Sequence, residues 1–113
     1  MDDLENKWKE VAKKIQLHFN KENLPDLNAI LFLIGIRELG VIKNKFTKEE
    51  KQDLMHIAVC RLLSEEGYYE LDFVDQDGWP HWSPSMPMEK MSLGEQENLL
   101  KVNIIRYFEE IYE

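Results

Sequence analysis

Cysteine is nearly absent from this chain of 113 residues, in which Cys60 is the only one. An internal disulfide is therefore excluded, and the fold must be held together by packing. A lone cysteine within an apolar stretch is usually a small core residue, so we expect Cys60 inside the protein. The chain also begins with Met-Asp-Asp-Leu-Glu, which is unlike a signal peptide. Both features favour a protein of the reducing cytoplasm.

Long hydrophobic runs are missing as well. The longest, Leu27 to Ile36, covers about ten residues and is interrupted by Asn28 and Gly35. A helix that spans a bilayer needs roughly 20 apolar residues. We therefore expect this run to form a buried helix, and we expect no membrane partner.

The familiar signatures of cofactor binding and catalysis are also absent. The five glycines are scattered, so the chain has no glycine-rich phosphate loop, and it has no nucleophile elbow. The segment Asp75-Gln76-Asp77-Gly78 superficially resembles a calcium loop. However, aligning Gly78 with the invariant glycine puts Phe73 and Pro84 at ligand positions. The sequence therefore predicts no cofactor, no metal ion and no catalytic residue.

What the sequence does contain is the pattern of a mainly helical α+β domain over residues 1–113. Apolar residues at helical spacing predict four helices: residues 3–19, 26–39, 47–66, and a last one from residue 92 through residue 111. Aromatic and branched residues alternate around Asp77-Gly78, which predicts a β-hairpin with strands Tyr68–Val74 and Trp79–Trp82. The hairpin thus lies between the third and fourth helices, and the helix that includes residues 27–39 is central.

Local signals mark where several of these helices begin and end. Thr47 with Glu50, and Ser92 with Glu95, have the spacing of capping boxes. Gly40 follows the second helix, where a left-handed residue would end it. A loop from Val41 to Phe46 is expected before the third helix.

Charge is distributed unevenly. The chain carries a net charge of −8, yet no Lys or Arg occurs between Arg61 and Lys90. The acidic residues in that stretch are Glu65, Glu66, Glu70, Asp72, Asp75, Asp77 and Glu89. Large aromatics lie among them, so residues 65–89 form what we call the acidic aromatic hairpin, a pattern suited to binding a basic protein. The candidate interaction residues are Tyr69, Asp72, Asp75, Asp77, Trp79, His81 and Trp82.

The partner of the acidic aromatic hairpin is expected to be a basic protein or a second copy of the chain. A homodimer would close the open strand edge, but it would bring like charges together, which favours the basic protein. We expect exposed aromatic surface at Trp79 or Trp82. Because Lys and Arg are missing here, nucleic acid is not expected as a partner.

Two other interpretations remain open. The third helix places Glu49, Asp53, His56 and Cys60 at steps that share a face, and Asp53-Leu54-Met55-His56 has the carboxylate-x-x-His spacing of some metal bundles. A small metal-dependent enzyme using Asp53, His56 and His81 is therefore one alternative. The simpler reading is a semi-polar helix face.

The other alternative rests on topology. Residues 26–83 resemble a helix-turn-helix domain with a wing in the order of their elements. The resemblance departs where DNA would bind, because the third helix is apolar from Leu54 to Leu63 and the hairpin is acidic. A winged-helix-like domain of this kind would serve protein rather than DNA contacts.

Overall fold

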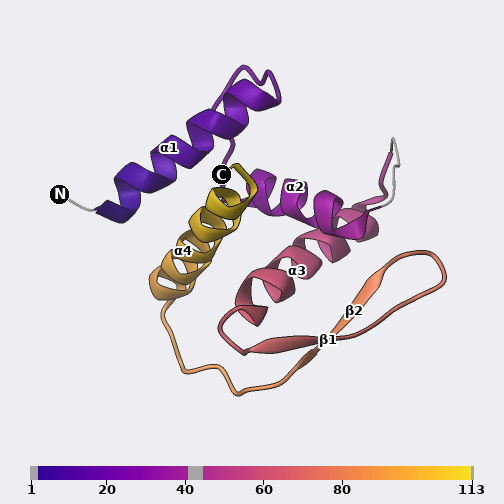
Figure 1. Ribbon diagram of the computed structural model, residues 1–113. Helices are drawn as coiled ribbons and strands as arrows, with labels where there is room; N and C mark the ends of the chain where they lie inside the picture. The colour runs from indigo at the N-terminus through magenta and orange to yellow at the C-terminus, as the bar shows by residue number, and fades with distance from the viewer. Residues whose placement is uncertain (1–2, 41–44, 113) are drawn as a thin grey trace. The chain divides into compact units, whose positions relative to one another are not determined.

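A computed structural model describes residues 3–40 and 45–112 of the chain. It confirms the predicted fold class, four helices with a hairpin between the third and fourth. The elements in Figure 1 are α1 (Asp3–His18), α2 (Leu27–Leu39), α3 (Lys48–Ser64), β1 (Tyr69–Val74), β2 (Pro80–Pro84) and α4 (Leu93–Tyr112). The predicted loop from Val41 to Phe46 lies largely outside the described residues. In the described part of the chain, no helix is long and apolar enough to cross a membrane.

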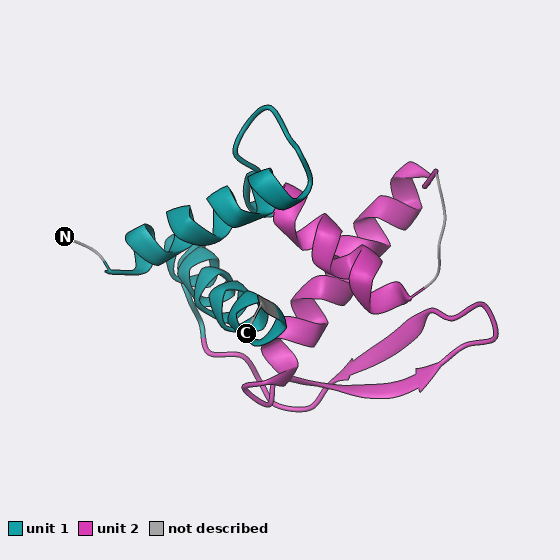
Figure 2. Ribbon diagram, turned by 45° about the horizontal axis from the view of Figure 1, so that its top comes forward, with its two compact units in different colours: residues 1–27, 90–113 teal, residues 28–89 magenta. Residues whose placement is uncertain are grey.

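The chain divides into two compact units, shown in different colours in Figure 2. Unit 1 comprises residues 1–27 and 90–113, and unit 2 comprises residues 28–89. That the whole chain folds as one domain stays a prediction.

Unit 1 is built from α1 and α4, which pack against each other. The predicted apolar face of α1 is confirmed at Val11 and Ile15, which are buried. The helix ends at His18, one residue before the predicted end, and Asn20 then turns the chain with a φ of 53°. Phe19 is consequently exposed.

The capping box that was predicted at the start of α4 is confirmed. The backbone N–H of Ser92 donates to Glu95 Oε1 at 3.0 Å, and the Glu95 N–H donates to Ser92 Oγ at 3.1 Å. The N–H of Ser92 holds the pKa of Glu95 below its ordinary value. These two bonds satisfy donors that the first helical turn would otherwise leave without partners.

Unit 2 depends on a close approach between α2 and α3. Gly35 is buried in α2, and a Cβ at this position would overlap the backbone carbonyl of Leu54 and lie 2.9 Å from the Leu54 Cβ. The neighbouring residues Ile30 and Ile34 are also fully buried, which confirms that this helix is central to its unit. Glycine is thus the residue that lets the two backbones meet.

Helix α3 begins and ends with defined caps. Thr47 Oγ1 accepts from the Glu50 N–H at 3.1 Å, and Glu50 Oε1 accepts from the Thr47 N–H at 2.9 Å, as predicted. At the other end Gly67 has a φ of +88°, and the N–H of Tyr68 donates to the carbonyl of Leu63 at 3.2 Å. This is the bonding of a Schellman motif, and it turns the chain directly into β1.

The two strands form an antiparallel sheet that packs against α3. The turn is confirmed at Gly78, which has a φ of +88° and donates to the carbonyl of Asp75 at 3.0 Å. The register is irregular between Leu71 and Phe73, which is a β-bulge. Pro80 begins β2, a position where its missing N–H costs no ladder bond.

Replacing Gly35 with alanine should destabilise unit 2. In an open helix site this change would stabilise the protein by up to about 1 kcal/mol, because alanine is the better helix former. Here the methyl group meets the backbone of Leu54, which cannot swing aside as a side chain would. We expect a net loss of about 1–3 kcal/mol in the free energy of unfolding, measured by urea denaturation.

The matched control is Gly94→Ala in the first turn of α4, where the nearest atom to the added Cβ is Ser92 Oγ at 3.9 Å. That variant should be as stable as the wild type or slightly more so. Equal stability of the Gly35→Ala and Gly94→Ala proteins would contradict the close approach of α2 and α3.

Candidate functional site

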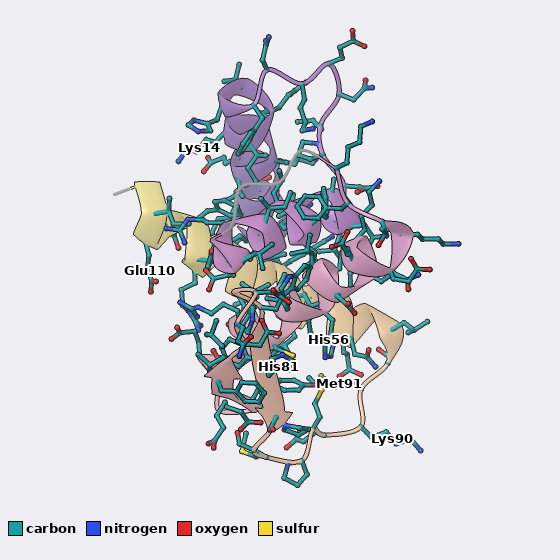
Figure 3. The ribbon with its side chains drawn as sticks, turned by 90° about the vertical axis from the view of Figure 1, so that its right-hand side faces the viewer. Lys14, His56, His81, Lys90, Met91 and Glu110 are labelled. Atoms are coloured by element: carbon teal, nitrogen blue, oxygen red, sulfur yellow. The ribbon has the colours of Figure 1, made fainter. Side chains whose placement is uncertain are left out.

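A pocket lies within unit 2 between α3 and the hairpin, with a volume of about 340 Å³. We call it the hairpin pocket. Its lining consists of Asp53, His56 and Ile57 from α3 and Asp75, Trp79, Pro80, His81 and Trp82 from the hairpin. Figure 3 labels His56 and His81, which come to this pocket from the two different elements. Among the described residues, no lysine or arginine lines it.

Asp75 organises the hairpin side of the pocket. Its Oδ1 accepts from the N–H groups of Asp77 at 2.9 Å and Trp79 at 3.0 Å, and its Oδ2 is hydrogen-bonded to His81 Nε2 at 2.8 Å. The bond with His81, followed by those from the two amides, holds the pKa of Asp75 below its ordinary value. One carboxylate therefore fixes both the turn and the position of the imidazole.

The imidazole of His81 also makes a stacking contact. Its ring is stacked on Phe73 with the centroids 4.4 Å apart and the planes 7° from parallel. Phe73 is 55% exposed, whereas Trp79 and Trp82 are half-buried. The prediction of exposed aromatic surface on the hairpin is thus confirmed, but the residue is Phe73 and not Trp79 or Trp82.

The two tryptophans connect the pocket to the interior of unit 2. Trp79 packs against the cluster formed by Leu39, Leu54 and Ile57. Trp82 Nε1 is buried and, among the described residues, has no hydrogen-bond partner.

On the α3 side, Asp53 is exposed, and within residues 3–40 and 45–112 its carboxylate makes no hydrogen bond or ion pair. His56 packs edge-on against Tyr69, with ring centroids 6.5 Å apart. His56 Nε2 also lies 3.5 Å from Cys60 Sγ. Burial raises the pKa of Cys60 to about 11, so its thiol is protonated at neutral pH and is a poor nucleophile.

The structure brings most of the predicted residues together. Asp75, Trp79, His81 and Trp82 line one pocket with Asp53 and His56. Tyr69 packs against His56. Asp72 accepts a hydrogen bond from the Ser83 hydroxyl, and Asp77 is exposed in the turn. None of these last three predicted residues lines the pocket.

Sequence reasoning missed two residues of the lining, Ile57 and Pro80. Pro80 stands between two predicted residues in the chain, and Ile57 directly follows His56. Neither side chain carries a polar group, so only proximity in the sequence could have indicated them.

The chemistry available in the hairpin pocket is limited. In the part of the chain that the structure describes, no group of three or more His, Cys, Asp or Glu residues is placed to hold a metal ion. The pair of Asp75 and His81 resembles part of a catalytic triad, but the described residues of the lining include no Ser, Thr or Cys to act as nucleophile. What remains is two carboxylates, two imidazoles and two indoles, a set suited to holding a cation.

Comparisons with protein-family models, with curated proteins and with solved structures find no match to this chain. The function is therefore inferred from the geometry of the pocket and from the distribution of charge.

The lowered pKa of Asp75 predicts how the stability of the protein depends on pH. Folding favours the ionised form of this group, so its contribution to stability is present above the ordinary aspartate pKa of about 3.9. The contribution is lost as the pH falls through the lowered pKa of the folded state. An Asp75→Asn protein should therefore melt below the wild type near neutral pH, and the difference should shrink under acidic conditions.

The measurement is the thermal midpoint as a function of pH, followed by tryptophan fluorescence. Asp77→Asn is the control, because it removes a neighbouring carboxyl group that makes no side-chain hydrogen bond among the described residues. If the thermal midpoints of the wild type and Asp75→Asn differ by the same amount at every pH, the role assigned to Asp75 is contradicted.

Proposed function

We propose that this protein is a non-enzymatic interaction module that binds a basic partner protein through its acidic aromatic hairpin. The observation that carries the proposal is the hairpin pocket, whose lining, as far as the structure describes the chain, has two carboxylates and two tryptophans but no Lys or Arg. It opens in a stretch of the chain that holds seven acids and no Lys or Arg. An acidic surface of this kind steers a basic partner toward it.

Exposed apolar side chains on β1 support the same proposal. Leu71, Phe73 and Val74 are all exposed, although they belong to a strand. Apolar and aromatic side chains of this kind are the usual anchors of protein interfaces, and acids around them supply orientation. The lone, buried Cys60 agrees with action in a reducing compartment, and we propose the cytoplasm.

A basic partner is favoured over a second copy of the chain. A homodimer formed through the hairpin would place the exposed acids Glu70 and Asp77 near their own copies, at a cost in like-charge repulsion. A basic protein would instead neutralise them. The proposal includes neither nucleic acid nor membrane as a partner.

A small enzyme is the second candidate, and one observation favours it. Asp53, His56 and His81, which the sequence suggested for a metal-dependent enzyme, line the same pocket. Their imidazoles and carboxylate are groups that serve in acid–base catalysis. This candidate ranks second because the part of the lining that the structure describes offers neither a nucleophile nor a group of ligands placed for a metal ion.

A winged-helix-like arrangement is compatible with the first proposal. The order α2, α3, β1, β2 within unit 2 has that topology, and α3 packs against the hairpin. The exposed side of α3 alternates Lys48 and Lys51 with Glu49 and Asp53, so it presents no basic stripe for a phosphate backbone. Such a domain would serve protein contacts.

The proposal predicts salt-sensitive binding of a basic peptide to the acidic aromatic hairpin. The probe is a short fluorescent peptide of alternating arginine, lysine and glycine, titrated with the protein and followed by fluorescence anisotropy. Neutralising Glu70, Asp77 and Glu89 together, as Glu70→Gln, Asp77→Asn and Glu89→Gln, should weaken binding about tenfold, because each exposed charge contributes roughly 0.2–1 kcal/mol. Higher ionic strength should weaken binding of the wild type.

The control removes the same amount of charge elsewhere, by changing the exposed residues Glu10, Glu97 and Glu110 to Gln. That protein should bind the peptide within about twofold of the wild type. An equal loss in both triple variants would mean that only net charge matters, and it would overturn the proposal, as would no binding at low ionic strength.

A further inference from the structure

The hairpin pocket has the size and chemistry to take one side chain of the partner. Its volume of about 340 Å³ lies at the small end of ligand pockets, which run from about 300 to 1,000 Å³. Such a space admits a single long side chain and not a folded element.

We infer that the pocket takes the guanidinium group of an arginine from the basic partner, paired with Asp53 and stacked on a tryptophan of the pocket. This inference rests on the proposed function and names the group that the partner inserts. Asp53 lines the pocket, and no hydrogen bond or ion pair occupies its carboxylate within the described residues. The other carboxylate of the lining, Asp75, is already bonded to His81 and to two amides.

The two tryptophans of the lining favour arginine over lysine. Trp79 and Trp82 both line the pocket. A guanidinium group is planar and weakly hydrated, so it can stack on an indole while its N–H groups pair with a carboxylate. A lysine ammonium group is compact and strongly hydrated, and it gives up more solvation on entering a pocket of this kind.

Other occupants fit the lining less well. An acidic side chain would meet two carboxylates, and a purely apolar one would bury Asp53 without a partner. Inorganic anions are disfavoured for the same reason. A metal ion would need more ligands, and among the residues described none form a group of three or more placed to hold one.

The test uses Nα-acetyl-arginine methylamide as the probe, added to the full ¹⁵N-labelled protein. The chain has three tryptophans, and Trp8 belongs to unit 1 and does not line the pocket. We expect the indole N–H signals of Trp79 and Trp82 to shift saturably while that of Trp8 stays in place. Nα-acetyl-citrulline methylamide, which has the same shape without the charge, should shift none of them, and the lysine analogue should bind at least about threefold more weakly.

The matched variants are Asp53→Asn and Glu49→Gln, which remove one charge each from neighbouring turns of α3. Asp53→Asn should weaken binding of the arginine probe about tenfold, the factor that corresponds to about 1.4 kcal/mol. Glu49→Gln should bind as the wild type does, because Glu49 is exposed and does not line the pocket. Unchanged ¹⁵N spectra away from residue 53 would show that Asp53→Asn is folded.

The outcomes separate this inference from the proposed function. If the basic peptide binds the acidic aromatic hairpin but the arginine probe leaves Trp79 and Trp82 unmoved, the pocket assignment is overturned and the interaction proposal stands. Equal binding of citrulline or lysine probes, or an equal loss in the two variants, would also overturn the assignment. Saturable shifts with the arginine probe that are lost only in Asp53→Asn would establish the pocket assignment, even if neutralising the hairpin acids did not weaken binding of the basic peptide.

Discussion

The contact on which unit 2 depends is the approach of α2 to α3 at Gly35, where no side chain separates the helix from the backbone of Leu54. That approach completes the cluster of Leu39, Leu54 and Ile57, against which Trp79 packs. The hairpin is thereby anchored to α3 through its turn. A two-stranded hairpin is marginally stable alone in water, so this anchoring is what gives the pocket fixed walls.

Beyond this contact with α3, the carboxylate of Asp75 orders the rest of the hairpin's turn. Asp75 fixes the turn through two amides and fixes His81 through its other oxygen, and His81 in turn stacks on Phe73. The carboxylate of Asp75 is therefore already occupied, and Asp53 is the carboxylate of the lining with no hydrogen bond or ion pair in the described chain. The proposed function uses what the fold leaves available: a small pocket lined by acidic and aromatic side chains, on a hairpin rich in acids.

Features that depend on neighbouring residues were predictable from the sequence, and features that depend on register were not. Thr47 with Glu50, Ser92 with Glu95, and Gly78 act through local backbone bonds, so their spacing identified the caps and the turn. The candidate residues of the hairpin were also found, because the charge bias is visible in the sequence. The β-bulge after Leu71 was not foreseen, yet it determines that Phe73 pairs with His81 and so helps to place the exposed aromatic ring. The meeting of Asp53 and His56 with the hairpin is tertiary, and no spacing within one helix could establish it.

The most direct test of the account is to map where a basic partner touches the protein. The measurement is the change in backbone amide shifts of the ¹⁵N-labelled full chain on adding an arginine-rich peptide. We predict that the shifted amides fall within residues 65–89 and around Asp53 to Ile57 on α3. Shifts concentrated on α1 and α4, or spread evenly over all exposed acids, would contradict it.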